Sequence, residues 1–162
     1  MYTREALLDI HERCHRTLAL LLEHCSELTP DELHRELDGF GCPTVQRQLH
    51  HVISAEKYWT GVLCGRMDTE DTENDYPTIA SLQSYREEIF TLTRDYIESA
   101  SPEELNTPRK MMTWGDNEVT LAPALVVLRP QMHIYHHQGQ VLAMCRLMKK
   151  PANGFDFPVR TD

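Results

Sequence analysis

The sequence predicts an all-α protein built as a four-helix bundle, because apolar residues recur at helical spacing in four long segments. The chain has 162 residues, enough for one domain with its own hydrophobic core. Apolar residues make up 41% of it and charged residues 25%, which is ordinary for a globular protein. We therefore expect a single domain that spans residues 1–162.

The first helix is expected from about residue 3 to residue 28. Its apolar stripe repeats at spacings of three and four residues. The stripe consists of Leu7, His11, Cys14, Leu18, Leu21 and Cys25. A sequence that favours termination (TPDE, 29–32) follows, and then a short helical turn through Leu33 and Leu37.

A second helix is expected from Pro43, a residue that the first helical turn tolerates, to about Gly65. Its stripe consists of Val45, Leu49, Val52, Trp59 and Leu63. Glu56 falls inside this stripe. A buried carboxylate needs a partner, so Glu56 is either hydrogen-bonded for structure or close to a functional site.

A third helix is expected over residues 82–101, and a last one from Pro123 to Lys149 with a kink at Pro130. The link between the second and third helices is fairly short, which predicts that these two are antiparallel neighbours. A long crossover segment precedes the last helix. Within it, residues 109–113 and 118–121 flank a glycine-containing turn and predict a short β-hairpin.

The charge and the cysteines restrict the classes of partner and the compartment. The formal net charge is −9 with no basic patch, so we expect neither nucleic acid nor membrane as a partner. The acidic segment 68–75 lacks the glycine and terminal glutamate of an EF-hand and predicts a solvated loop. The five cysteines form no C-x-x-C pair and no secretion signal is seen, which favours reduced thiols in a cytoplasmic protein.

Three of the nine histidines are candidate metal ligands. His133 and His137 lie one turn apart on one helix face, on a line that Gln140, Met144 and Leu147 continue toward the core. Two such imidazoles can converge on one metal ion, although ordinary buried histidines show the same spacing. His51 borders the apolar stripe of the second helix and can supply a third imidazole.

The neighbouring histidines receive other interpretations. His50 is expected to face solvent. His136, on the flank of its helix, is expected either to support the neighbouring ligands or to be exposed. Residues 11–15 (HERCH) match the H-E-x-x-H signature of zinc metalloproteases. Since His15 is shifted to the edge of its stripe and no clear third ligand follows, we interpret this match as coincidence, with His11 lining a cavity from the first helix.

Two segments give the sequence its resemblance to a known family. Residues 39–41 (GFG) and 49–59 (LHHVISAEKYW) look like the second helix of the DinB-like (YfiT-like) metal-binding bundles, where a histidine precedes A-E-x-x-W. Residues 133–140 (HIYHHQGQ) look like the H-x-x-H-H-R-G-Q signature on the fourth helix of that family. By this resemblance the three metal ligands are His51, His133 and His137.

The resemblance also implies a function. Three neutral imidazoles leave a coordination position of a divalent ion (zinc or nickel, or iron) open, as in catalytic sites. Characterised relatives include thiol-dependent transferases and isomerases that use small thiols such as bacillithiol or mycothiol, so a metal-dependent S-transferase-like enzyme acting on a small-molecule substrate is implied. A metal-dependent hydrolase and a non-catalytic metal-binding or stress-response module are the alternatives. A homodimer is a further expectation from the family.

Few other residues are candidates for chemistry. Glu56 is the one candidate acid or base, and a structural role is an equal alternative for it. Gln138 stands where the family usually has arginine, so an anion contact of that arginine is not carried over. The candidates for an apolar pocket lining are Tyr58, Trp59, Met112 and Trp114.

Overall fold

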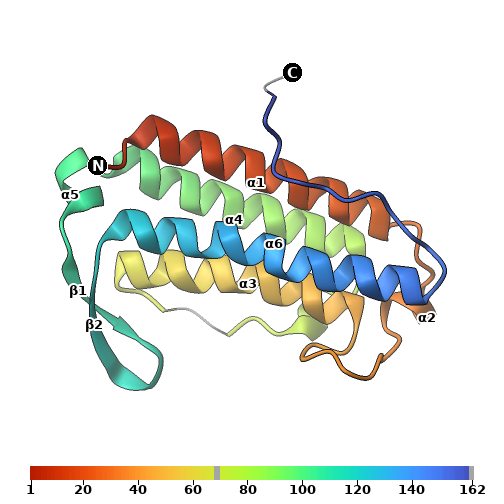
Figure 1. The fold of residues 1–162 in the computed structure, drawn as a ribbon. Coiled ribbons are helices and arrows are strands. Elements are labelled where there is room, and N and C mark those ends of the chain that lie inside the picture. The colour runs from red at the N-terminus through yellow and green to blue at the C-terminus, as the bar shows by residue number, and fades with distance from the viewer. Residues whose placement is uncertain (68–69, 161–162) are drawn as a thin grey trace.

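Four long helices packed side by side form the body of the computed structural model, which describes residues 1–67 and 70–160 (Figure 1). They are α1 (Arg4–Cys25), α3 (Val45–Cys64), α4 (Ile79–Ser99) and α6 (Pro123–Leu147). The short elements are α2 (Pro30–Leu33), η1 (Glu73–Asp75), α5 (Pro102–Asn106), β1 (Arg109–Thr113), η2 (Trp114–Asp116) and β2 (Asn117–Leu121). The predicted all-α class, its four long helices and the hairpin before the last helix are confirmed.

The ends of the long helices follow local capping chemistry. Thr3, Thr44 and Thr78 begin α1, α3 and α4, and each side chain accepts a hydrogen bond from a backbone N–H of the first turn. Helix α6 begins with Pro123, whose missing N–H needs no partner there. Helix α3 ends at Gly65, whose φ of 66° is a left-handed conformation that glycine adopts without strain.

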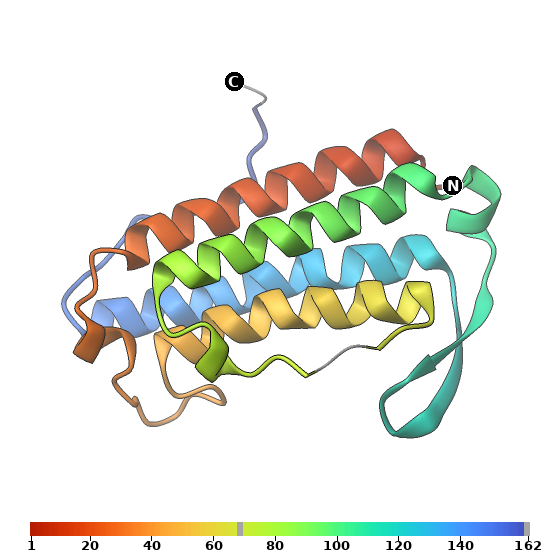
Figure 2. The ribbon, with the colours of Figure 1, turned by 180° about the vertical axis from the view of Figure 1, so that it is seen from behind.

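Helices α3 and α4 are neighbours, but they run parallel, and the prediction that they are antiparallel is wrong. Near the start of both helices, His50 stacks on Tyr85. Farther along both, Thr60 and Thr93 share a hydrogen bond of 2.9 Å. Residue numbers therefore rise in the same direction along the two helices, as Figure 2 shows.

The link between α3 and α4 explains this error. The link consists of residues 65–78. Fully extended, a chain of that length reaches on the order of 45 Å, which is more than the roughly 30 Å length of α3. The described parts of the link return along α3: Asp71 pairs with Lys57, and Gln46 donates to the carbonyl oxygens of Glu73 and Tyr76. Asp68 and Thr69 of the acidic segment lie outside the described residues.

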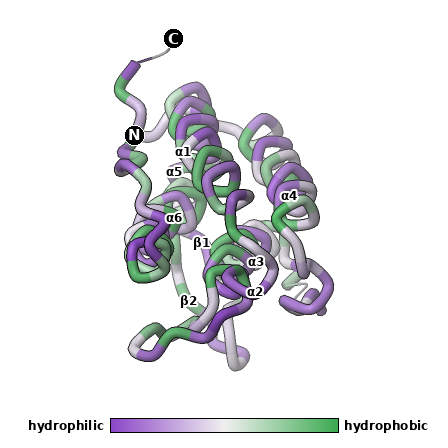
Figure 3. The backbone as a smooth tube through the Cα atoms, turned by 90° about the vertical axis from the view of Figure 1, so that its right-hand side faces the viewer, coloured by the Kyte–Doolittle hydropathy of each residue, from purple (hydrophilic) through white to green (hydrophobic). Residues whose placement is uncertain are grey.

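Two clusters of buried apolar side chains fill the bundle. The larger contains Leu18, Leu49, Leu82 and Met144, one from each long helix. The other, near α5 and the hairpin, contains Trp59, Ile97, Leu105 and Val127. Figure 3, a view along the bundle, shows hydrophilic and hydrophobic residues alternating along the helices, as amphipathic helices require. Within the described ranges, no helix has the length and apolar character needed to span a bilayer.

The element boundaries differ from the predicted ones by a few residues. Helix α1 ends at Cys25, and α6 continues past Pro130 to Leu147. The side chain of Leu147 is 65% exposed, so the predicted line of core-facing residues on α6 stops at Met144. In the hairpin, Gly115 has a φ of 65° and allows the tight connection between β1 and β2.

Candidate metal centre

His51, His133 and His137 meet where α3 packs against α6. These helices are antiparallel, so residues early in α3 lie opposite residues late in α6. The Nε2 atoms of His51 and His133 lie 3.0 Å apart. The three ring centroids are separated by 4.3 to 5.1 Å, and one nitrogen of each ring lies within 4.8 Å of the others. The structure therefore brings the three predicted ligands together as a candidate metal-binding group.

The electrostatics of this group suit a cation. Burial and, after it, the neighbouring His51 together lower the pKa of His133 to about 4. Burial and the neighbouring His133 lower the pKa of His137 to about 4, and burial also lowers the pKa of His51. Neutral imidazoles whose nitrogens face one another are ligands that zinc, nickel and iron accept. The residues present thus fit a divalent metal ion.

Gln48 orients one of these imidazoles. The Nδ1 atom of His137 donates a hydrogen bond to Oε1 of Gln48, which directs the other ring nitrogen toward His51 and His133. The amide nitrogen of Gln48 is itself held by the carbonyl oxygen of Cys42 and by Oε1 of Gln140. Sequence reasoning missed Gln48, although its position one turn before His51 on α3 was a usable signal.

A cavity of about 810 Å³ opens beside His51 and His133. Its apolar wall includes Tyr58, Trp59, Trp114, Leu125, Leu128 and Met132. Three of the four predicted pocket residues are therefore confirmed. Met112 is not among the described residues that line the cavity, because strand alternation buries Met111 and leaves Met112 42% exposed on the opposite face.

The aromatic side chains form an ordered wall with one cation above it. The rings of Tyr58 and Trp114 stack with centroids 4.1 Å apart, and Trp59 meets Trp114 edge to face. The guanidinium of Arg129 lies 4.8 Å from the centre of the Trp59 ring. Arg129 precedes His133 by one helical turn, so this positive charge lies on the side of the cavity next to the candidate ligands. Arg129 was not among the residues expected from the sequence to form the site.

The two flanking histidines differ in outcome. His136 is exposed at the rim of the cavity, the second of its two predicted alternatives. The prediction that His50 faces solvent is wrong, since its side chain is only 8% exposed and stacks on Tyr76 and Tyr85. The returning link and α4 cover this face of α3, and periodicity within α3 alone does not reveal that cover.

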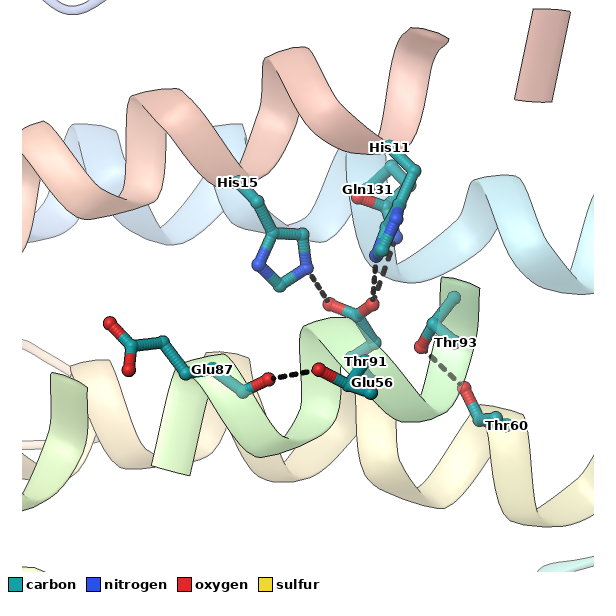
Figure 4. A network of polar contacts seen from close by, with 8 residues as sticks. All are labelled: His11, His15, Glu56, Thr60, Glu87, Thr91, Thr93 and Gln131. Carbon is teal, nitrogen blue, oxygen red and sulfur yellow. Dashed lines mark hydrogen bonds and ion pairs between the residues drawn. The ribbon is translucent and has the colours of Figure 1, made fainter. Parts of the chain in front are cut away.

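A second polar cluster lies inside the bundle (Figure 4). The Nε2 atoms of His11 and His15 lie 3.0 and 2.8 Å from the two carboxylate oxygens of Glu56. The amide nitrogen of Gln131 donates to the same carboxylate at 3.3 Å. Burial raises the pKa of Glu56, but the two histidines lower it more, and the net shift is downward. Glu56 therefore has buried hydrogen-bond partners, the first of its two predicted alternatives.

This cluster corrects three predictions about the H-E-x-x-H segment. His15 is buried rather than at the edge of its stripe, and His11 does not appear among the described residues lining the cavity. Glu56 lies close enough to His11 and His15 to be a third ligand, although the sequence suggested none. The protease interpretation still fails, because Glu12, which would have to act as base, is exposed and does not belong to the cluster.

Comparison with known proteins agrees with this arrangement. A search of curated proteins found no match. The family model described as "DinB family" matches residues 4–162, which is nearly the whole chain. The four-helix arrangement and the three converging histidines are the features that the motif resemblance led us to expect. The chain belongs to the DinB family.

Proposed function

We propose that the protein binds one divalent metal ion through His51, His133 and His137 and uses it as an S-transferase-like enzyme for low-molecular-weight thiols. The observation that carries the proposal is the convergence of three imidazoles, two of them with pKa values lowered to about 4, at the edge of an aromatic-walled cavity. Zinc and nickel are the first candidates for the ion, and iron is the next.

The chain's own residues prepare the site. A divalent cation held there lowers the pKa of a bound thiol or water. Gln48 fixes the orientation of His137, while Tyr58, Trp59 and Trp114 form an aromatic wall on one side of the cavity. Arg129 offers a positive charge to an anionic group of a substrate, because no ion pair is recorded for it among the described residues.

The acids around the cavity favour a transferase over a hydrolase. Among the described lining residues, the one carboxylate is that of Asp71, and it is engaged by Lys57 and by the hydroxyl of Tyr85. Glu56 is not on the cavity wall. A thiol bound to the cation would have a lowered pKa and could release its proton to solvent without a separate base, whereas hydrolases commonly use a base to activate water.

Metal content tests the first half of the proposal. After dialysis against mixed divalent ions, elemental analysis should show the metal of this site in the wild type and its loss in His51→Ala and His137→Ala. His136→Ala, which changes an exposed neighbour, is the matched control and should retain the metal. A metal content in both ligand variants equal to that of the wild type would show that the three histidines do not hold the ion.

Turnover tests the second half. A panel of small thiols with a generic aromatic halide electrophile should give metal-dependent conjugates, measured by absorbance. Conjugation that is lost with the metal and restored by its return supports the transferase. Metal binding without turnover across the panel would leave the non-catalytic module as the better description. By family resemblance we also propose a homodimer, which light scattering would report as twice 18.8 kDa.

A further inference from the structure

We propose that His11, His15, Glu56 and Gln131 form a second metal site, closed to solvent and separate from the site at His51. The inference starts from the convergence drawn in Figure 4. Ligand atoms of His11, His15 and Glu56 lie within 4.8 Å of one another. The exposed fractions of these three residues are 0%, 2% and 1%. Two imidazoles and a carboxylate are a donor set that zinc and related ions accept.

The four long helices place this cluster rigidly. His11 and His15 are one turn apart on α1, and both Nε2 atoms point at the carboxylate of Glu56 on α3. Gln131, which is 0% exposed, approaches from α6. From α4, the ring of Phe90 stacks on His11 at 4.8 Å and meets His15 edge on. Such enclosure leaves no open position for a substrate, so the site is structural rather than catalytic.

Charge balance favours a cation in the cluster. The net downward shift in the pKa of Glu56 keeps its carboxylate ionised. Burial outweighs the attraction of that carboxylate and lowers the pKa of His15, which favours its neutral form. Arg86 lies near His15 and its charge also acts on Glu56, but its guanidinium contacts the exposed Glu87 at 3.3 Å rather than the carboxylate of Glu56. An ionised carboxylate beside the neutral His15 deep in a bundle is costly unless a positive charge is shared with it.

An unpartnered atom of Gln131 points the same way. Its Oε1 is buried and has no hydrogen-bond partner among the described residues, while its Nε2 lies at 3.3 Å from Glu56. The two ends of an amide are distinguished by their partners alone. If the amide of Gln131 is turned by 180°, its Oε1 faces the carboxylate oxygen of Glu56. These two oxygens repel each other unless a cation lies between them. Gln131 then becomes the fourth ligand of a tetrahedral site with two nitrogens and two oxygens.

The experiment begins with the open site removed. His133→Ala/His137→Ala protein, prepared from cells grown with cobalt and confirmed as helical by circular dichroism, should retain about one Co²⁺ per chain with visible d–d absorption. Adding Glu56→Gln should abolish that absorption. Glu12→Gln changes the exposed glutamate within residues 11–15 and should leave the absorption unchanged. Folded His133→Ala/His137→Ala protein without cobalt would overturn the proposal.

Two further measurements test the closed site without relying on Glu56→Gln. X-ray absorption at the cobalt edge should show two imidazole ligands in His133→Ala/His137→Ala protein, and a finding of none would contradict the site. In the wild type, a chelator should remove one metal quickly and the other slowly, because only the second site is enclosed. A single fast phase would contradict it.

The outcome pattern separates this proposal from the proposed function. Metal that survives His133→Ala/His137→Ala but not Glu56→Gln supports the closed site even if the open site binds nothing. Metal that shows the opposite dependence supports the open site and overturns the closed one.

Discussion

At the scale of single residues, protonation of the buried histidines connects the candidate metal centre to stability. His133 and His137 have folded-state pKa values of about 4, below their ordinary value of 6.5, chiefly because burial disfavours the charged form. Between these values the unfolded chain binds more protons than the folded one. The free energy of unfolding of the metal-free protein must therefore fall as the pH falls through that window.

We predict that metal-free wild type is less stable at pH 5.5 than at pH 7, measured as the urea midpoint in the presence of a chelator. His133→Gln/His137→Gln protein lacks two of the responsible groups and should lose less over the same interval. Both proteins retain His15, whose pKa is also lowered, so its contribution cancels in the comparison. Equal losses in the two proteins would show that these imidazoles are not buried in the neutral form.

The orientation of His137 gives a second prediction at this scale. Gln48→Ala removes the acceptor for Nδ1 of His137 and should weaken metal affinity by about 10- to 100-fold. Gln140→Ala is the matched control, because Gln140 contacts Gln48 but makes no recorded contact with His137. Competition with a coloured chelator measures the metal affinity of both variants. Affinity lost equally in the two variants would argue for a general loss of packing instead.

At the scale of elements, α3 is the helix on which the two polar sites depend. It contributes His51 to the open group and Glu56 to the buried cluster, more than one turn farther along. Its C-terminal end is fixed by Gly65 and by a hydrogen bond from the backbone nitrogen of Arg66 to the carbonyl oxygen of Gly61. This tight reversal starts the link that returns along the helix.

The two helical glycines give a prediction for this element. A Cβ at Gly61 would lie 2.3 Å from the carbonyl oxygen of Arg66, whereas one at Gly139 on α6 meets nothing within 4 Å. Gly61→Ala should therefore destabilise the protein by about 1–3 kcal/mol, because backbone has to shift. Gly139→Ala should stabilise it by roughly 0.5–1 kcal/mol through helix propensity. Thermal or urea unfolding checks both signs, and a neutral Gly61→Ala would mean that the reversal is looser than described.

At the scale of the whole molecule, the C-terminal segment runs back along α1 and then turns away from the bundle, as Figure 1 shows. Arg13 on α1 donates to the carbonyl oxygens of Pro158 and Arg160, at 2.8 and 2.9 Å. Gln138 donates to the carbonyl oxygen of Phe155 at 2.6 Å. The residue that replaces the family's usual arginine thus holds the tail.

The net charge of −9 gives a prediction for the molecule as a whole. The phosphate backbone of DNA repels a protein of this charge, so the protein should not shift a labelled DNA duplex in a gel. This should hold even at low salt, where any attraction between basic residues and phosphate would be screened least. A basic DNA-binding domain in the same gel serves as the positive control. A clear shift that disappears with added salt would show a positive surface that the sequence does not reveal.

Apolar spacing and the family motif were enough to predict the local structure and the three candidate ligands. Apolar spacing within a helix depends on residues one turn apart, so the four long helices, the hairpin and the pairing of His133 with His137 followed from it. The third ligand, His51, followed from its place beside the stripe of α3 and from the family motif. These properties need no knowledge of how the helices are arranged.

How the helices face one another depends on packing between segments that are distant in the sequence. The direction of α4 depends on where the returning link lies, and that link also buries His50 under Tyr76 and Tyr85. The meeting of His11, His15 and Glu56 joins residues more than 40 positions apart. Their proximity arises from packing between α1 and α3, because a helix's own periodicity says which face is buried but not which partner covers it.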